Sequence, residues 1–244
     1  MPRGGTLRCG TERRRWRPGP KRRQPSLPRA EPERRLVDPH RIVREGYDAI
    51  AGTYERWAAS FESPTLATLE RLLATLPPAS HVLDLGCGNG LPIARRLVER
   101  GHRVTGVDGS AGQLERARRN VPEIAVVHAD ALEADLPPGS FDAAVCAFVL
   151  GHVPRDEHPL LLRRLHGWLR PGAPALVSFA LSDTEAVVED WLGAPMFFSA
   201  YPPETSLRLL AEAGFALEWA AEVPQDEPGH GLVSFLWTLS RRLP

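Results

Sequence analysis

The sequence predicts an α/β protein with a doubly wound, mostly parallel sheet. Short apolar runs alternate with helix-like segments over residues 82–179, and such alternation is typical of βαβ units with right-handed crossovers. The first run, residues 82–85, leads into Gly86, Gly88 and Gly90. Glycines let the backbone turn sharply and allow a ligand to lie directly against it. We therefore expect one large domain organised around this turn.

The predicted elements follow a regular order. Two helical stretches come first, at about residues 39–61 and 66–76, and Pro77 and Pro78 end the second. The last two predicted strands are joined by a short polar loop, which suggests an antiparallel pair. Residues 182–202 are expected to be irregular. The predicted strands cover residues 82–85, 103–108, 125–128, 143–148, 175–179, 215–222 and 232–239, and the predicted helices between them cover residues 92–99, 113–119, 159–169 and 204–213.

Residues 1–35 are predicted to be a disordered extension. They carry twelve basic and three acidic residues, several prolines and few aliphatic side chains, so they cannot bury enough surface to fold alone. A basic arm that binds nucleic acid is the alternative, although basic runs without interleaved aromatic residues are usually only solvated. Residues 36–244 hold 18 basic and 27 acidic residues, so the predicted domain is acidic.

Composition narrows the classes of protein further. No apolar run approaches the roughly 20 residues that span a bilayer, and the first residues do not resemble a secretory signal. We expect a cytoplasmic protein that does not insert into membranes. The three cysteines form no paired framework or C-x-x-C motif, and the eight histidines show no ligand spacing. Neither disulfides nor a metal site is therefore predicted.

The glycine turn does not fit a dinucleotide site. The G-x-G-x-x-G fingerprint requires its third glycine at position 91, where this chain has Leu91 and places its glycine one residue early. Asp108, at the end of the second strand, is placed to accept hydrogen bonds from both hydroxyls of a ribose. Asp130 and the amide of Ala131 end the third strand, where they would suit an adenine. Together these residues predict a site for an adenosine.

The motifs, taken together, resemble the class I S-adenosylmethionine-dependent methyltransferase family over residues 40–240. The resemblance rests on residues 84–90 (DLGCGNG), Asp108, the Asp130–Ala131 pair, the strand beginning at Phe141–Asp142, and residues 169–172 (LRPG). Each motif is weak alone, whereas their order is specific. The resemblance implies a Rossmann-like sheet of seven strands in the order 3-2-1-4-5-7-6, with the last strand antiparallel. It also implies S-adenosylmethionine as cofactor and methyl transfer as the reaction.

The resemblance also implies how the cofactor is held. Gly86, Gly88 and Gly90 approach its methionine portion, and Asp84 helps to hold the ammonium group. Capping or turn chemistry is the other interpretation of Asp84 and of Asp130. Their position at the carboxyl ends of neighbouring strands favours ligand binding. The remaining contacts implied are Asp108 for the ribose, Asp130 and Ala131 for the adenine, and Phe148 after the fourth strand.

The acceptor is predicted to be a small, largely apolar molecule. The chain lacks an Asn/Asp/Ser-Pro-Pro-aromatic motif after the fourth strand, and an acidic domain repels phosphates, so nucleic acid is disfavoured. Small-molecule members of the family cover the cofactor with segments that correspond here to a helical lid at about residues 39–76 and an insertion at residues 182–202. Ordinary core packing is an equally good interpretation of the apolar side chains there. The candidate acceptor contacts are Tyr47, Tyr54, Trp57, Trp191, Met196, Phe197, Phe198 and Tyr201.

Catalysis needs a base only if the acceptor must lose a proton. His152 is the first candidate and His230 the second, although a lone histidine is more often structural. We therefore expect a methyltransferase that acts on a small apolar metabolite, with specialised metabolism as a suggested setting. Two alternatives stay open: a nucleic-acid or protein methyltransferase that uses the basic arm, and a non-catalytic cofactor-binding protein on the same fold. The sequence leaves the oligomeric state undetermined.

Overall fold

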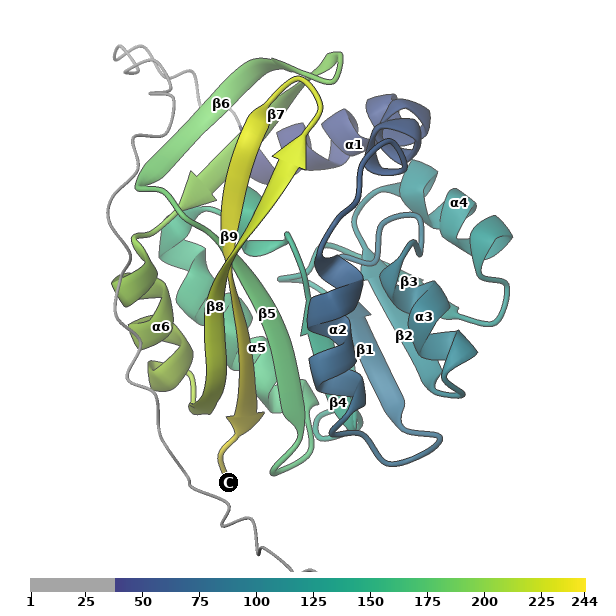
Figure 1. Cartoon of the computed structure of the whole chain (residues 1–244), viewed down its shortest axis with the longest axis vertical. Coiled ribbons are helices and arrows are strands. Elements are labelled where there is room, and N and C mark those ends of the chain that lie inside the picture. Colours follow the sequence, from purple (N-terminus) through teal and green to yellow (C-terminus); the bar gives the residue numbers. More distant parts are fainter. Residues whose placement is uncertain (1–37) are drawn as a thin grey trace, which may run out of the picture.

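A computed structural model describes residues 38–244 and confirms the predicted fold class (Figure 1). The predicted extension at residues 1–35 lies outside the described residues. A sheet of seven strands has the order β3-β2-β1-β4-β5-β9-β8. Counting only the strands of this sheet in chain order, β8 is the sixth and β9 the seventh, because β6 and β7 form a separate sheet. Strands β1 to β5 pair in parallel, and β9 runs antiparallel to both β5 and β8.

The elements follow the predicted order. The strands of the large sheet are β1 (His81–Leu85), β2 (Arg103–Asp108), β3 (Ala125–His128), β4 (Ala143–Cys146), β5 (Pro174–Ala180), β8 (Phe215–Glu227) and β9 (Gly231–Arg242). The helices are α1 (Pro39–Ala58), α2 (Thr65–Leu73), α3 (Ile93–Glu99), α4 (Ala111–Asn120), α5 (His158–Trp168) and α6 (Pro203–Glu212). Two short 3₁₀ turns, at Leu150–His152 and Arg155–Glu157, connect β4 to α5.

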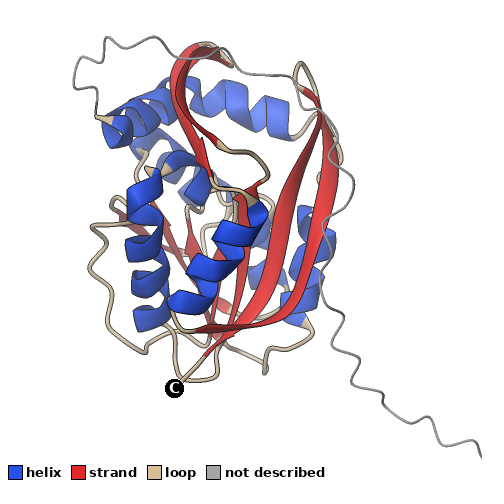
Figure 2. Cartoon of the chain, turned by 90° about the vertical axis from the view of Figure 1, so that its left-hand side faces the viewer, coloured by secondary structure: helices blue, strands red, loops and turns tan. Residues whose placement is uncertain are grey.

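The sheet is the middle layer of three, with helices on both faces (Figure 2). On one face, α5 and α6 contribute Leu161, Leu165 and Leu210 to a core with the sheet. On the other face, Leu69 of α2, Leu97 of α3 and Ala117 of α4 form the second core. Because both faces are covered, the central strand β4 is buried along its whole length, whereas β3, at the edge of the sheet, is exposed at both of its ends.

The segment at residues 182–202 differs from the prediction, because it is a β-hairpin and not irregular. Strands β6 (Thr184–Trp191) and β7 (Ala194–Ala200) pair antiparallel in a separate sheet of two strands. One side of this hairpin packs against α1, where Met196 and Trp191 join Ile50 in a third apolar cluster. Packing against a helix stabilises a hairpin that would be marginal by itself.

Helix α1 lies across the carboxyl ends of the strands as a roof (Figures 1 and 2). Asp38 caps it, because its side chain accepts a hydrogen bond from the His40 amide, and Pro39 occupies the first helical turn. Polar contacts fix α1 to the start of α4: Asp48 accepts hydrogen bonds from the Ser110 hydroxyl at 2.6 Å and the Gly112 amide at 2.9 Å. Within residues 38–244, no helix has the length and apolar character needed to cross a membrane.

Candidate functional site

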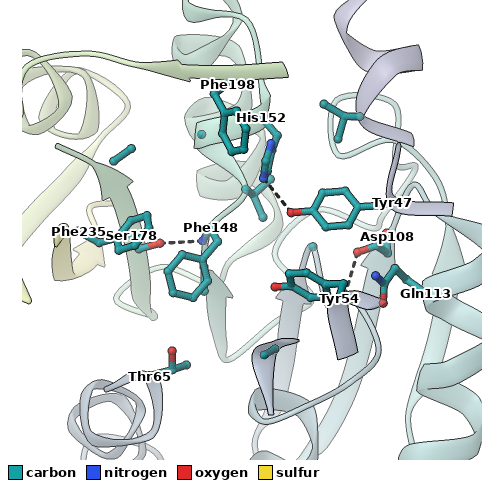
Figure 3. Close-up of a pocket in the computed structure, with 18 of the residues that line it drawn as sticks. Tyr47, Tyr54, Thr65, Asp108, Gln113, Phe148, His152, Ser178, Phe198 and Phe235 are labelled. Carbon is teal, nitrogen blue, oxygen red and sulfur yellow. Dashed lines mark hydrogen bonds between the residues drawn. The ribbon is translucent and has the colours of Figure 1, made fainter. Parts of the chain in front are cut away.

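A cavity of about 900 Å³ lies between the carboxyl ends of the parallel strands and the roof formed by α1. The hairpin of β6 and β7, the end of β8 and the start of β9 line its other sides (Figure 3). Most of the residues predicted for the site meet here. The predicted residues that line the cavity are Tyr47, Tyr54, Trp57, Asp84, Gly86, Gly88, Asp108, Asp130, Ala131, Phe148, His152, Trp191, Phe198 and His230.

The three glycines of the turn have different roles. All three have positive φ, at 73° for Gly86, 53° for Gly88 and 81° for Gly90. Residues that carry a Cβ atom rarely adopt this backbone conformation. A Cβ at Gly86 would lie 2.3 Å from the Val149 side chain, and one at Gly90 would press on Val121. At Gly88 the nearest atom would be 4.0 Å away. Gly86 and Gly90 are therefore needed for packing, whereas Gly88 leaves open space towards the cavity.

Asp108 is held in place by the turn that it faces. Its carboxylate accepts hydrogen bonds from the Gly88 amide at 2.8 Å and from the Ser110 amide at 2.9 Å. Burial raises the pKa of Asp108, while these two amide donors oppose the rise. A carboxylate oxygen can accept more than one hydrogen bond, so each oxygen can still accept one from a diol.

Asp84 is buried and has an unsatisfied oxygen. Its Oδ2 is enclosed and has no hydrogen-bond partner, and only 2% of the residue is exposed. Burial, together with the nearby Asp108, raises the pKa of Asp84 to about 7. A buried carboxylate without a partner is costly, and a cationic group is the partner that would remove the cost. This fits the ammonium group of S-adenosylmethionine.

Gln113 is a cavity residue that the sequence prediction missed. Ser110 and Gln113 have the spacing of a capping box, in which the glutamine side chain would reach back to the Ser110 amide. Here Asp108 already accepts that amide hydrogen. The Gln113 amide group is therefore left with both its nitrogen and its oxygen unpaired, although the residue is only 1% exposed. It lies beside Gly88 and Asp108 and offers one donor and one acceptor to a ribose (Figure 3).

Asp130 carries a contact that the sequence did not predict. Its Oδ1 accepts the Leu132 amide at 2.8 Å, and its Oδ2 lies 3.1 Å from Nδ1 of His40 on α1. The other ring nitrogen of His40 lies 2.7 Å from Glu157. Burial alone would lower the pKa of His40, but the two carboxylates raise it above its ordinary value. The protonated ring therefore ties the start of α1 to the predicted adenine end of the cavity.

Aromatic rings form another part of the cavity wall. Tyr54 lies 5.8 Å from Trp57 and 6.0 Å from Trp191, and Trp57 lies 5.9 Å from Trp191, measured between ring centroids. Nearer the turn, the Phe148 ring packs edge-on against Phe235 at 4.8 Å. These rings make the acceptor side of the cavity largely apolar, as small-molecule sites commonly are.

His152 and Tyr47 form a hydrogen-bonded pair in the cavity wall (Figure 3). Nδ1 of His152 lies 2.9 Å from the Phe197 carbonyl, which can only accept, so Nδ1 carries the hydrogen. Nε2 is then the acceptor for the Tyr47 hydroxyl at 2.9 Å. Burial lowers the pKa of His152 to about 4, so the ring is neutral at pH 7. His230 is exposed at the rim, with Nδ1 3.3 Å from the Pro228 carbonyl.

The structure places four predicted site residues outside the cavity wall. Met196 is fully buried against Gly46 of α1, and Phe197 contributes its carbonyl to His152 and not its ring. Tyr201 packs edge-on against His158 at 5.5 Å, on the far side of β7. Gly90 is the fourth, and it packs on α4. Residues 38–244 contain no group of three or more His, Cys, Asp or Glu side chains that is arranged to bind a metal ion.

Comparisons with known proteins bear on the family and the fold. A family profile described as a methyltransferase domain matches residues 82–172. The chain is 32% identical over 185 residues to 27-O-demethylrifamycin SV methyltransferase of Amycolatopsis mediterranei, covering 69% of this chain and 66% of that protein. It is 43% identical over 102 residues to an uncharacterized methyltransferase of Mycobacterium tuberculosis, covering 40% of this chain and 50% of that protein.

A solved structure has the same fold. The 1,6-didemethyltoxoflavin-N1-methyltransferase of Burkholderia thailandensis, crystallised with S-adenosylhomocysteine, superposes with a TM-score of 0.68 at 24% identity, covering 87% of this chain and 93% of that one. The chain thus spans half to about two thirds of the length of the two curated relatives named above. The shared domain, the sheet order and the cofactor-sized cavity agree with one another. The chain belongs to the class I methyltransferase family, whose cofactor is S-adenosylmethionine.

Proposed function

We propose that this protein transfers the methyl group of S-adenosylmethionine to a small, largely apolar acceptor. The main observation behind the proposal is that the predicted cofactor residues and a group of aromatic side chains line one continuous cavity. Asp84, Gly88 and Asp108 line the same cavity as the rings of Tyr54 and Trp57. An enclosed aromatic space next to a cofactor site suits a small aromatic or terpenoid-like molecule. The relative from Amycolatopsis, by its name, acts on a demethylrifamycin, which agrees with a small acceptor in specialised metabolism.

When bound, S-adenosylmethionine supplies an activated methyl group, so the protein contributes mainly orientation and exclusion of water. Asp84, whose buried oxygen has no partner, would hold the ammonium group, and Asp108 would hold the ribose hydroxyls. Helix α1 keeps water out, because Tyr47 and Tyr54 project from it into the cavity (Figure 3). These side chains would orient the acceptor towards the methyl group of the cofactor.

The hydrogen-bonded pair of His152 and Tyr47 could accept a proton from the acceptor. The Tyr47 hydroxyl donates to Nε2 of His152, so its oxygen still has a lone pair for a hydroxyl group of an acceptor. In an O-methylation, the acceptor proton would pass to the Tyr47 oxygen while the Tyr47 proton passes to Nε2. His152 is therefore proposed as the base that acts through Tyr47, and no such role is proposed for the exposed His230.

The proposal is tested in two steps with the full-length chain. Calorimetry first measures binding of S-adenosylhomocysteine, and absence of binding would contradict the enzymatic and the cofactor-scaffold hypotheses together. Radiolabelled S-adenosylmethionine is then offered with small phenolic and quinol acceptors, with transfer RNA and with a protein mixture. Methyl transfer to a small acceptor supports the proposal. Transfer only to RNA or protein, lost when residues 1–35 are deleted, would support the arm hypothesis instead. Cytoplasmic location stays a prediction of the sequence.

A further inference from the structure

The charged side chains in the cavity wall are strongly unbalanced. Apart from histidines, seven carboxylates and a single guanidinium, that of Arg44, line it. Asp84, Asp108 and Asp130 belong to the proposed cofactor end, and Glu55 is paired with Arg116. Three carboxylates at the acceptor end have no such assignment, and they are Glu62, Asp190 and Glu227. Neutral or cationic molecules are therefore favoured in this part of the cavity over carboxylates and phosphates.

Glu227 is the most firmly held of the three. It ends β8, and one of its oxygens accepts a hydrogen bond from the Gln225 side chain. Gln225 is buried, with 7% exposed, and accepts a hydrogen bond from Ser63 at 3.3 Å. Ser63 in turn bonds Thr65 at 2.7 Å. This chain of hydrogen bonds fixes the direction of a carboxylate that forms no ion pair with any Lys, Arg or His in residues 38–244.

Aromatic side chains contact the turn that follows this carboxylate. The Trp57 indole N–H donates to the Pro228 carbonyl at 3.0 Å, which fixes the indole next to the residue that follows Glu227. His230, on the same turn, lies edge-on to Trp57 at 6.0 Å. The Tyr54 hydroxyl points into the cavity (Figure 3). Burial, together with Asp108 and Glu227, raises the pKa of Tyr54 to about 12.

We infer that the acceptor carries a positively charged nitrogen, which binds between the Glu227 carboxylate and the rings of Trp57 and Tyr54. A carboxylate supplies a charge-assisted hydrogen bond, and ring faces supply cation–π attraction. This inference rests on the proposed function and extends it by naming a substrate class: an apolar body with a basic amine at one end. A protonated nitrogen has no lone pair, so the methyl group goes to another atom of the same molecule, nearer the glycine turn.

The test compares three probes with one bicyclic body. The full-length chain, saturated with S-adenosylhomocysteine, is titrated with 1-naphthylmethylamine, 1-naphthalenemethanol and 1-naphthoate at pH 7, with Trp fluorescence and calorimetry as readouts. We expect the ammonium probe to bind about tenfold more tightly than the alcohol and the carboxylate to bind most weakly. In Glu227→Gln the ammonium and alcohol probes should bind about equally.

The control variant is Glu222→Gln, an exposed carboxylate on the same strand outside the cavity wall, which should keep the preference for the ammonium. Equal binding of ammonium and alcohol by the native chain would overturn the inference. So would no binding of the ammonium probe, or an unchanged preference in Glu227→Gln. Binding of S-adenosylhomocysteine is measured first and separately. Its absence would contradict the proposed function, whereas its presence with no preference among the probes would contradict only the cation subsite.

Discussion

Replacing Gly88 by Ala should damage cofactor binding far more than it damages the fold. A Cβ at this position would meet no protein atom closer than 4.0 Å, so the added methyl group enters the space in which the cofactor lies. The backbone has φ of 53°, and a left-handed conformation costs an L-residue roughly 1 kcal/mol. That cost lowers the Tm by about 3 °C for a domain of this size. A methyl group forced into a fitted contact costs about 1–3 kcal/mol more.

The affinity for S-adenosylhomocysteine should therefore fall by about 10- to 100-fold, as measured by calorimetry on the full-length chain. Gly101→Ala is the matched control, because Gly101 has φ of 81° and no atom within 4 Å of the added Cβ, and it lies outside the cavity wall. It should lose a similar amount of stability and no affinity. The reasoning is refuted if Gly88→Ala binds like the native chain, or if Gly101→Ala loses as much affinity.

Three further predictions follow from buried polar groups. The folded-state pKa of Asp84 is raised from 3.8 to about 7. The free energy of unfolding of the ligand-free protein should therefore fall as the pH rises from about 4 to about 7. Urea unfolding curves of Asp84→Asn should lack this fall. The pKa of His152 is lowered from 6.5 to about 4, so its effect has the opposite sign. The free energy of unfolding of the native chain should fall as the pH drops from about 6.5 to about 4, and His152→Gln should lack this fall. Gln113→Leu should keep or raise the free energy of unfolding, because an unpaired buried amide is removed, while affinity for S-adenosylhomocysteine falls about tenfold.

A specific result would contradict each of these predictions. Identical pH dependence of unfolding in Asp84→Asn and the native chain would show that the Asp84 carboxylate is not the group that titrates. The same result for His152→Gln would show that the ring is not held neutral. For Gln113→Leu, unchanged affinity would remove the side chain from the ribose site. Gln225→Leu, the same substitution elsewhere in the cavity wall, is the control for the cofactor titration.

The sheet and the cofactor end of the site were predictable from the sequence. Strand β1 and its glycines form a continuous local pattern, and Asp108 stands where its strand must end. Parallel strands align their carboxyl ends at one edge of the sheet, so residues distant in sequence, such as Asp84 and Asp130, could be placed together in advance. The structure brings these residues to one cavity, as the sequence order implied.

The acceptor end was less predictable, because it depends on packing between separate elements. In β6, acidic residues interrupt the apolar pattern, and the strand forms because Val187 and Val188 pair with Phe197 and Met196 of β7. Strand alternation then decides which side chains reach the cavity, so Phe198 lines it and Phe197 does not. His40 was missed for a similar reason, because its partners Asp130 and Glu157 lie 90 and 117 residues away.

Helix α1 contributes residues to both ends of the cavity. On one side, α1 is tied to the cofactor end through His40 and Asp48; on the other, it supplies Tyr54 and Trp57 to the acceptor end. A ligand that fixes the helix at either end therefore also shapes the opposite end. Thermodynamic linkage makes that effect reciprocal: whatever factor the cofactor adds to acceptor affinity, the acceptor adds to cofactor affinity.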